Sequence, residues 1–326
     1  SKGDRVLVVC EDETRPTPIH LILPSLFRRL QTIGIPAAKI RILMAYGLHR
    51  PMNREALAKK LGPEAVGTFS VLHHDAFQRN DLFHVGDTSF GTPVYLNRAI
   101  KEADMVIGIG TISLSKEAGY GGGAKIIMPG IAGAETIYRS HAKVADHPNQ
   151  VGRIRDNPIR KEIEESGKMA GLDFLINTVL NEQGHICRII CGHPDPVFRN
   201  GIELFNRLYR FEIPEPFDLL IVGSSPMDMD FYQANKAITA SSLGVRDGGA
   251  IILASPCWNG ISPFPYFDEM IMSGKDFMQW SDLIRASDLE HKVAAEICLG
   301  LRYLQDLRKT AIGLVSPGIP HGRIAT

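Results

Sequence analysis

The chain has 326 residues, and its 36 Lys and Arg side chains balance 36 Asp and Glu side chains, so the formal net charge is zero. This balance argues against a nucleic-acid-binding protein and against attachment to an acidic membrane surface. No apolar run is long enough to span a membrane and no signal peptide is recognisable, so we expect a cytoplasmic protein. The cysteines number five, an odd count that suits a reducing compartment.

Apolar runs alternate with amphipathic runs from the start of the chain, which predicts strands followed by helices. Asn53 is placed to cap a helix that begins directly after it. Residues 181–184 predict a turn between two antiparallel strands. We expect strands at residues 6–10, 40–45, 104–110, 174–180 and 186–191, and helices at residues 24–33, 54–61, 134–140 and 197–209.

Pro214 and Pro216 interrupt this pattern and predict a linker, so we place two domains at residues 1–212 and 213–326. Alternating strands and helices are typical of parallel sheets covered by helices. The predicted fold class is therefore α/β, with two α/β domains, largely parallel sheets and the active site in the interdomain cleft. In the second domain we expect strands at residues 218–223, 249–254 and 311–316, and helices at residues 232–243 and 289–307.

Polar side chains follow the predicted strands at their carboxyl ends, where ligands bind in such folds. After the first strand, Asp12 and Thr14 are suited to ribose hydroxyls or phosphate, and Arg15 is suited to a carboxylate. After the second strand, His49 follows a glycine turn and is suited to the role of general base. The plainer interpretations are a rigid turn with a surface ion pair and a structural histidine.

A glycine-rich loop follows the third predicted strand. The backbone N–H groups of Gly121, Gly122 and Gly123 can approach an anion closely, and Lys125 can meet a phosphate or act as a nucleophile. The spacing is not that of the P-loop, because Ile126 stands where that loop needs Ser or Thr. A glycine-rich turn with a solvated lysine is the alternative.

Two other places combine polar groups with a predicted helix end. His141 follows the helix at residues 134–140, where it can ligate a metal or cap the helix. Tyr232, Gln233 and Lys236 begin a helix of the second domain, and Gln233 and Lys236 share one face of it. A helix N-terminus with a lysine and an amide is suited to a carboxylate, whereas the plainer interpretation is a solvated helix surface.

The order and spacing of these motifs resemble the nickel-dependent lactate racemases and related 2-hydroxyacid racemases and epimerases. The resemblance covers nearly the whole chain and is densest between Asp12 and His141. The matching segments are Asp-Glu-Thr-Arg-Pro-Thr-Pro at 12–18, Gly-Leu-His-Arg-Pro-Met at 47–52, Gly-Thr-Pro-Val at 91–94, Ala-Gly-Tyr-Gly-Gly-Gly-Ala-Lys at 118–125, Pro-Gly-Ile at 129–131, Thr136 with Ile137, His141, and Tyr-Gln-Ala-Asn-Lys at 232–236.

The resemblance implies a cofactor, the nickel-pincer nucleotide, which is a pyridinium mononucleotide with two sulfur-bearing arms that hold nickel. It implies a covalent attachment of this group to Lys125, and it makes His141 the protein ligand that completes the nickel coordination. Enzymes that build the cofactor are implied partners. The residues that the resemblance places against the nucleotide are Asp12, Thr14, Gly121, Gly122 and Gly123.

The resemblance also implies a reaction, in which the ring carbon opposite nickel accepts a hydride from C2 of a small 2-hydroxy acid. His49 would take the hydroxyl proton, and the planar keto acid would regain the hydride on either face. The residues implied near the substrate carboxylate or the reacting oxygen are Arg15, Tyr232, Gln233 and Lys236.

Ser115 departs from the family pattern, because family racemases carry a second catalytic histidine at this position, ten residues before the lysine. A serine is not a strong base near neutral pH without help, and racemisation conventionally uses one base per face. A water relay through Ser115, another base such as Lys116, His73 or His74, and His49 alone acting on a larger substrate are the alternatives, together with a loss of racemase activity. We expect an altered substrate, because the other motifs are intact.

The sequence therefore predicts an isomerase, a nickel-dependent racemase or epimerase of a 2-hydroxy acid, and the candidate substrates include acids larger than lactate, such as a sugar acid or a dicarboxylate. A non-catalytic protein that binds the nickel nucleotide or a hydroxy acid is the competing hypothesis. Family members have a segment before the first strand and a longer second domain, so the chain is either a short subtype or part of a longer product.

Overall fold

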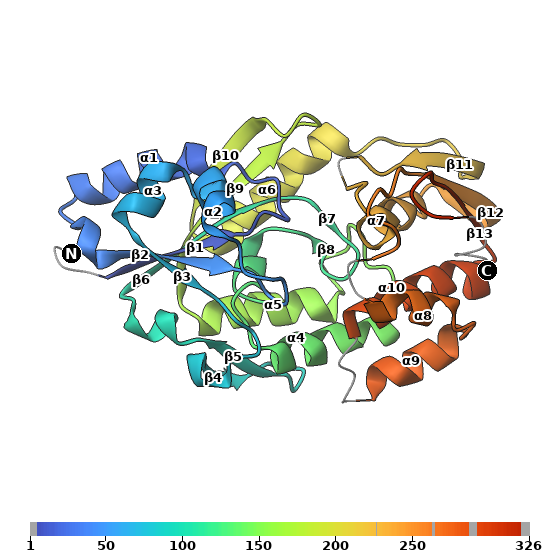
Figure 1. Cartoon of the computed structure of the whole chain (residues 1–326), viewed down its shortest axis with the longest axis horizontal. Coiled ribbons are helices and arrows are strands. Elements are labelled where there is room, and N and C mark those ends of the chain that lie inside the picture. Colours follow the sequence, from blue (N-terminus) through green and yellow to red (C-terminus); the bar gives the residue numbers. More distant parts are fainter. Residues whose placement is uncertain (1–4, 226, 263–264, 287–291, 321–326) are drawn as a thin grey trace. The chain divides into compact units, whose positions relative to one another are not determined.

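The computed structural model describes residues 5–225, 227–262, 265–286 and 292–320. The chain forms two compact units (Figure 1). The first contains the residues up to Ser113, Tyr120–Ser140 and Pro158–Arg210, and the second contains Leu114–Gly119, His141–Asn157 and the residues from Phe211 onward. Nothing in the sequence pattern indicated that two short segments from the first half would join the second unit. The boundary expected at residue 212 stays a prediction.

The first unit is built on a sheet with the strand order β10-β9-β6-β1-β2-β3. Neighbouring strands are parallel except at the edge, where β10 runs antiparallel to β9. This confirms the expected antiparallel pair beside a parallel sheet. The strands are β1 (Val6–Glu11), β2 (Ile40–Ala45), β3 (Ser70–His73), β6 (Met105–Thr111), β9 (Leu172–Leu180) and β10 (Ile186–Gly192).

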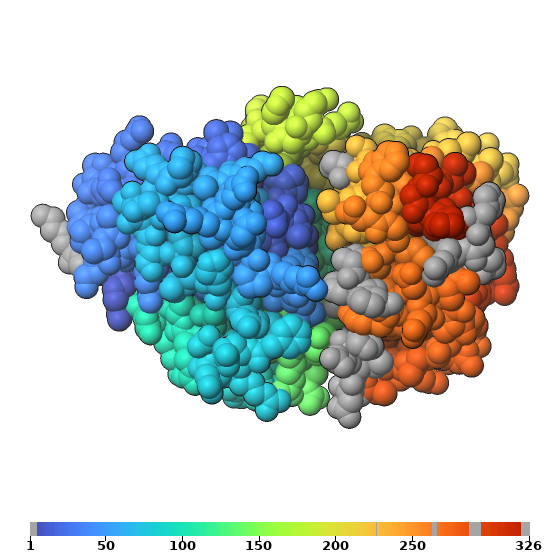
Figure 2. Space-filling view, in the orientation of Figure 1, coloured from blue at the N-terminus to red at the C-terminus, as the bar shows by residue number. Residues whose placement is uncertain are grey.

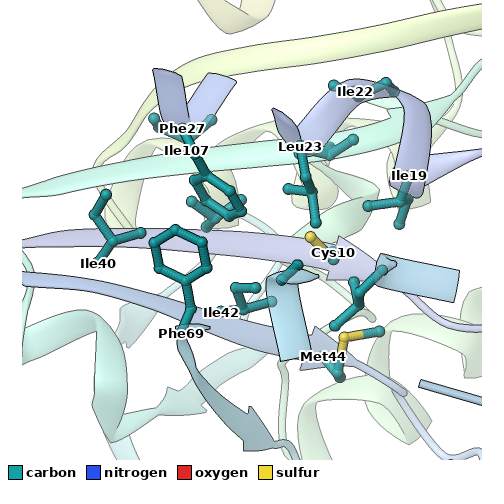
Figure 3. Packing of buried hydrophobic residues seen from close by; sticks show 14 of the residues in the cluster. Cys10, Ile19, Ile22, Leu23, Phe27, Ile40, Ile42, Met44, Phe69 and Ile107 are labelled. Atoms are coloured by element: carbon teal, nitrogen blue, oxygen red, sulfur yellow. The ribbon is translucent and has the colours of Figure 1, made fainter. Parts of the chain in front are cut away.

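One face of this sheet packs against three helices to form a hydrophobic core. Alternate residues of β1 point to this face, because successive side chains of a strand alternate between its two sides. Figure 3 shows Phe27 and Phe69 facing each other above the sheet, with ring centroids 3.9 Å apart. In Figure 2, the blue side chains of the three helices form the outer surface of this part of the unit. The helices are α1 (Ile19–Thr32), α2 (Arg54–Leu61) and α3 (Pro63–Thr68).

The other face of the sheet carries the segment that contains Lys125, a short 3₁₀ helix η4 (Gly123–Ile126). Gly108 of β6 makes room for it, because a Cβ at this position would lie 2.8 Å from Cγ2 of Ile126. The helices α4 (Ala134–His141), α5 (Pro158–Met169) and α6 (Pro194–Tyr209) come later along the chain, and α5 and α6 contact both η4 and β9.

Two small hairpins complete this half of the chain. The first pairs β4 (Leu82–Asp87) with β5 (Pro93–Asn97). The second pairs β7 (Leu114–Ser115) with β8 (Gly119–Tyr120), where the chain leaves the first unit and returns to it.

The second unit has a parallel sheet in the order β11-β12-β13, as expected from its alternating pattern. The strands are β11 (Phe217–Gly223), β12 (Val245–Ala254) and β13 (Ala311–Val315), and the helices are α7 (Phe231–Ser241), α8 (Pro265–Met272), α9 (Phe277–Arg285) and α10 (Lys292–Arg302).

No helix among the described residues, in either unit, has the length and apolar character needed to cross a membrane.

Two predicted helices differ from the structure by more than a helical turn at one end. The helix expected at residues 24–33 begins earlier, at Ile19, because Ile19, Ile22 and Leu23 extend its buried stripe and the helix accommodates Pro24 in its interior. The helix expected up to residue 307 ends at Arg302, and a π-helical turn, Tyr303–Leu307, follows it. The first residues of that prediction, 289–291, lie outside the described residues.

Candidate active site

The first group of polar residues follows β1, the strand from which the chain continues first to one side of the sheet and later to the other. From β1 the chain proceeds to β2 and β3 on one side, and later to β6 and β9 on the other side. In a parallel sheet the loops that leave two such neighbouring strands diverge, and this leaves a crevice suited to a ligand. The loop after β1 contains Asp12, Thr14 and Arg15, and the loop after β6 leads to the glycine-rich segment.

His49 and Asp12 meet because their strands are paired in register. Glu11 of β1 lies opposite Ala45 of β2, so the loops after the two strands are neighbours. Nδ1 of His49 lies 2.6 Å from Oδ2 of Asp12. Asp12 is buried, whereas the His49 ring is 43% exposed. A carboxylate on Nδ1 fixes the ring orientation and keeps the proton on that nitrogen, which leaves Nε2 as the basic atom.

Asp12 is held as a carboxylate by its neighbours. Burial acts to raise its pKa, but the hydrogen bond and charge of His49, the hydrogen bond of Thr14 and the charge of Arg15 outweigh burial and lower the pKa. Oδ1 of Asp12 accepts hydrogen bonds from the backbone N–H of Thr14 at 3.0 Å and from its hydroxyl at 2.6 Å. Asp12 is therefore placed to orient His49. The sequence did not reveal this role.

A buried lysine and a partly buried glutamate shape the loop that presents Arg15. Nζ of Lys60 donates to the carbonyl oxygens of Arg15, at 2.6 Å, and Thr17, at 2.9 Å. The Thr17 hydroxyl donates to Glu11 at 2.5 Å. Burial lowers the pKa of Lys60 and raises the pKa of Glu11. Neither residue belonged to the predicted site, because a lysine in a helix and a glutamate at a strand end carry no signal of this contact.

Glycine is needed in this loop because the loop has unusual backbone angles and packs closely against other segments of the protein. Gly122 and Gly123 have φ of 79° and 63°, which other residues adopt rarely. A Cβ on Gly123 would lie 2.7 Å from the Phe198 ring. The N–H of Gly121 donates to the carbonyl oxygen of Ser113, and that of Gly123 donates to the side chain of Asn177. A contact of these N–H groups with a phosphate stays a prediction.

Lys125 is the one residue between 122 and 128 that is not buried. Its neighbours Ala124 and Ile126 pack into the interior, and the rest of the segment is fixed to the loop of His49, since the N–H of Gly47 donates to the carbonyl oxygen of Gly130 at 2.9 Å. The lysine is therefore presented at the surface of a rigid segment.

In the second unit, His141 is paired with a buried carboxylate. Its Nδ1 lies 3.0 Å from Oε1 of Glu296 on α10, and the Glu296 side chain is 2% exposed. Histidines that bind metals usually donate from the other ring nitrogen to a carboxylate, which orients the ring. This pairing makes Nε2 the candidate ligand atom. Glu296 was not foreseen, because 155 residues separate it from His141.

The start of α7 places its polar groups as the sequence predicted. Asp230 caps the helix by accepting from the N–H of Gln233 at 2.8 Å. Nζ of Lys236 donates to Oε1 of Gln233 at 2.6 Å, so the two side chains act as one donor group. Burial raises the pKa of Tyr232, and the charges of Glu296 and Glu117 raise it further, so its phenol stays protonated.

Ser115 lies on β7 beside two charged residues. Its hydroxyl donates to Oε2 of Glu117 at 2.9 Å, and Nζ of Lys116 lies 3.5 Å from the other oxygen of Glu117. His74 is a poor substitute base, because it is 1% exposed and both of its ring nitrogens have partners, the Ala132 carbonyl and the Asn97 amide. His73 is hydrogen-bonded to the hydroxyl of Tyr46 at 2.9 Å.

The predicted residues thus fall into two groups, one in each unit. Asp12, Thr14, Arg15 and His49 form a connected network in the first unit. In the second unit, the charges of Glu117 and Glu296 act on Tyr232, and these two carboxylates bind Ser115 and His141 respectively. Among the residues that the structure describes, no three His, Cys, Asp or Glu side chains gather as a metal site.

Comparison with known proteins shows the family of the chain. Residues 1–152 match the family described as the lactate racemase N-terminal domain. The chain is 32% identical over 259 residues to the lactate racemase of Lactiplantibacillus plantarum, across 78% of this chain and 61% of that protein. The chain belongs to the lactate racemase family.

The similarity extends to a second lactate racemase and to two solved structures. The lactate racemase of Thermoanaerobacterium thermosaccharolyticum is 29% identical across 78% of this chain and 60% of that protein. The structure of its apoprotein has a TM-score of 0.88 at 26% identity, covering 97% of this chain and 76% of that one. A protein from Thermotoga maritima has a TM-score of 0.76 at 25% identity, covering 99% of this chain and 86% of that one.

The matched region spans about 60% of the length of the two lactate racemases. The family assignment and the α/β fold predicted from the motifs are confirmed by these likenesses.

Proposed function

We propose that the chain is a racemase or epimerase of a 2-hydroxy acid that works with a nickel-pincer nucleotide. The observation that carries the proposal is the pair of His49 and Asp12, 2.6 Å apart beyond the ends of two neighbouring strands in a fold similar to that of a lactate racemase. A histidine oriented by a buried carboxylate is suited to removing a hydroxyl proton. The same motifs include a lysine suited to anchor the cofactor.

The residues that would hold the cofactor fit such a group. Lys125 would be its covalent anchor, because its segment is rigid and it alone reaches out of the buried run. His141 would be the nickel ligand, because Glu296 engages Nδ1 and an imidazole nitrogen suits nickel. The cofactor brings further metal ligands of its own, so one histidine suffices. When bound, the group supplies a hydride acceptor for C2 of the substrate.

The remaining residues would bind and orient the substrate. Gln233 and Lys236 form a joint donor group at the N-terminus of α7, where the helix dipole also favours a carboxylate. Arg15 offers a second fork for a carboxylate or the reacting oxygen. Tyr232 remains a neutral hydroxyl and can hydrogen-bond the substrate oxygen. Nε2 of His49 would take the hydroxyl proton as C2 becomes planar.

A substrate larger than lactate, such as a sugar acid or a dicarboxylate, is part of the proposal. The resemblance implies a histidine at the position of Ser115. Because serine is smaller and a weaker base, this side of the site would have more room and would need a different proton route. Enzymes that assemble the nickel nucleotide are the partners that the proposal requires.

The test begins with the chain co-expressed with the cofactor-biosynthesis enzymes. Intact mass spectrometry should show an adduct of the nucleotide on the wild type, and chiral chromatography should show interconversion of at least one 2-hydroxy acid in a panel that includes lactate, malate and sugar acids. The matched control is Lys125→Arg, which keeps the charge but removes the amine that is needed for attachment, and so should carry no adduct.

The outcomes separate the two hypotheses. An adduct without interconversion of any acid would favour the non-catalytic binding protein, which the loss of a histidine at position 115 makes the second candidate. A wild type without an adduct, in cells where a known lactate racemase acquires one, would contradict the cofactor assignment.

A further inference from the structure

The hairpin of β7 and β8 holds a hydroxyl and a carboxylate in contact. The Ser115 hydroxyl directs its proton to Oε2 of Glu117 at 2.9 Å, and Oγ accepts from the N–H of Ala118 at 3.2 Å. A hydroxyl oxygen offers two acceptor lone pairs, so it can receive a proton while it gives one away. The Glu117 side chain is part-exposed, at 16%, and so remains accessible to solvent.

The hairpin is fixed in place by the segment 150–157. The N–H of Gln150 donates to the carbonyl oxygen of Lys116 at 2.7 Å, and the Asn157 amide donates to that of Glu117 at 2.8 Å. Gly119, with φ of 76°, sits so close to Arg153 that a Cβ would lie 1.9 Å from its carbonyl oxygen. These contacts hold Ser115 and Glu117 in one geometry, which a proton relay requires.

The pair lies within electrostatic reach of residues assigned to the substrate. The charge of Glu117 acts on Tyr232 at the start of α7, as does that of Glu296, the partner of His141. A pocket of about 480 Å³, including its opening to solvent, is lined by Lys116, Glu117 and Glu296 among others. Glu117 therefore lines one pocket with the carboxylate that binds the proposed metal ligand, and its charge reaches the proposed substrate-binding tyrosine.

We infer that Ser115 and Glu117 together form the second proton acceptor, in place of the family histidine. This rests on the proposed function. As the bond between the substrate oxygen and its proton breaks, that proton bonds to Oγ of Ser115, and the proton already on Oγ passes to Oε2 of Glu117. The electron pair of the broken bond stays on the substrate oxygen. One proton is thereby moved to Glu117, and the reverse transfer restores it.

Ser115 would be a catalytic residue, because it touches the reacting hydroxyl. Glu117 would act through Ser115, and the carboxylate makes up for the weak basicity of a hydroxyl. Proton transfer by a positioned group contributes roughly 10²–10⁴-fold to rate, so the loss of Glu117 should have an effect in this range.

The experiment uses the cofactor-loaded chain and the acid that the wild type interconverts. Glu117→Gln, which preserves the size of the side chain, and Ser115→Ala should each lower the rate by about 10²-fold or more with the adduct intact. Ser115→His supplies a base directly, so adding Glu117→Gln to it should change the rate less than about 3-fold. Glu212→Gln, an exposed carboxylate in the linker, is the control and should keep the wild-type rate.

Two further measurements exclude a purely structural role for Glu117. Binding of the hydroxy acid to the adduct-free protein, measured by calorimetry, should be within about 3-fold of wild type in Glu117→Gln, because a residue that only relays a proton adds little to ground-state binding. In mixtures of H₂O and D₂O, the wild-type rate should fall non-linearly with deuterium content, because two protons move, and Ser115→His should show a linear fall.

The experiment distinguishes a failure of the proton relay from a failure of the proposed racemase function. If the wild type is active and Glu117→Gln stays within about 3-fold of it, the relay is wrong while the racemase proposal stands. Equal losses from Glu117→Gln in the wild-type and Ser115→His backgrounds would also overturn the relay, since they show that Glu117 only supports the fold. A wild type that interconverts no acid removes the proposed function and the relay together.

Discussion

At the scale of single residues, the pair of Asp12 and His49 gives the first prediction. Asp12→Asn should lower the turnover number by about 10²–10⁴-fold with a small change in KM. The reason is that an amide can donate to Nδ1, which places the ring proton on Nε2, so that Nε2 can no longer accept the substrate proton. The measurement is steady-state kinetics on variants with equal adduct content. Glu13→Gln, at the exposed neighbouring position, is the control, and equal losses in both variants would contradict the orienting role.

His74 gives a prediction about pH. Burial lowers the pKa of His74 to about 4, below the value of about 6.5 for an unfolded chain. Because the folded pKa is the lower one, the neutral ring contributes its full stability above about pH 6.5 and loses it as the pH falls through about 4. Between pH 7 and pH 5, this residue alone should reduce the free energy of unfolding by about 2 kcal/mol.

Urea unfolding at the two pH values measures this effect. The difference between pH 7 and pH 5 should be about 2 kcal/mol smaller in His74→Gln than in the wild type. His20→Gln, at an exposed position, should keep the wild-type difference. A wild-type difference that persists in His74→Gln would show that other groups cause the acid sensitivity.

Some residue roles were predictable and others were not. The sequence placed His49 and Arg15 in loops beyond strand ends, where the structure has them, because the order of residues along the chain determines which side chains come directly after a strand. Lys125 was expected in such a loop too, but it lies in the short helix η4, after the β7–β8 hairpin. It could not reveal Glu296 behind His141 or Lys60 behind Arg15, because these contacts join distant segments. The role of Asp12 as support for His49 depends on the register of β1 and β2, which the motifs do not specify.

At the scale of elements, Gly108 of β6 determines how closely η4 approaches the sheet. Gly108→Ala should reduce the free energy of unfolding by about 1–3 kcal/mol, because its Cβ would lie 2.8 Å from Ile126 and 3.1 Å from Leu175. The displaced segment contains Lys125, so the yield of cofactor adduct should also fall. Urea unfolding and intact mass spectrometry provide the two measurements.

Gly67→Ala is the matched control. Gly67 lies in α3, and no atom other than those of its chain neighbours and its own helix backbone lies within 4 Å of the position that a Cβ would take there. The same change should therefore be neutral or should stabilise by up to about 1 kcal/mol. A loss of stability in Gly67→Ala as large as that in Gly108→Ala would show that packing against η4 is not the cause.

Elements with strong local patterns were predicted well. The apolar runs of β1 and β2 and the Asn53 cap of α2 match the structure, the cap accepting from the N–H of Ala56 at 2.9 Å. The helix α5 was missed, although it contains buried Arg160 and Glu162, because polar residues at buried positions hide its helical stripe. The helix α9 was missed despite a capping box formed by Asp276 and Gln279.

At the scale of the whole molecule, the second unit depends on segments from the first half of the chain. Asn149 donates to Ser242, Asp146 pairs with Arg285, and His141 pairs with Glu296. A fragment of residues 211–326 lacks these partners, so it should unfold at a lower temperature and less cooperatively than the same region in the intact chain. Circular dichroism during heating measures the difference.

A nicked chain provides the control. A protease site inserted in the exposed linker at residues 211–216 allows the backbone to be cut while every segment is retained, and this form should keep the melting temperature of the intact chain. A fragment 211–326 that melts as cooperatively and at the same temperature would show that the inserted segments contribute little.

The division of each unit into separate stretches of sequence also sets an order of events during synthesis. All segments of the first unit have been synthesised once Arg210 has been added, so its sheet can form before the rest of the chain is made. The stretches Leu114–Gly119 and His141–Asn157 must wait for Phe211 and later residues to leave the ribosome. Until then, His141 lacks the Glu296 carboxylate, so the nickel binding that we propose for this residue would be among the last properties that the nascent protein acquires.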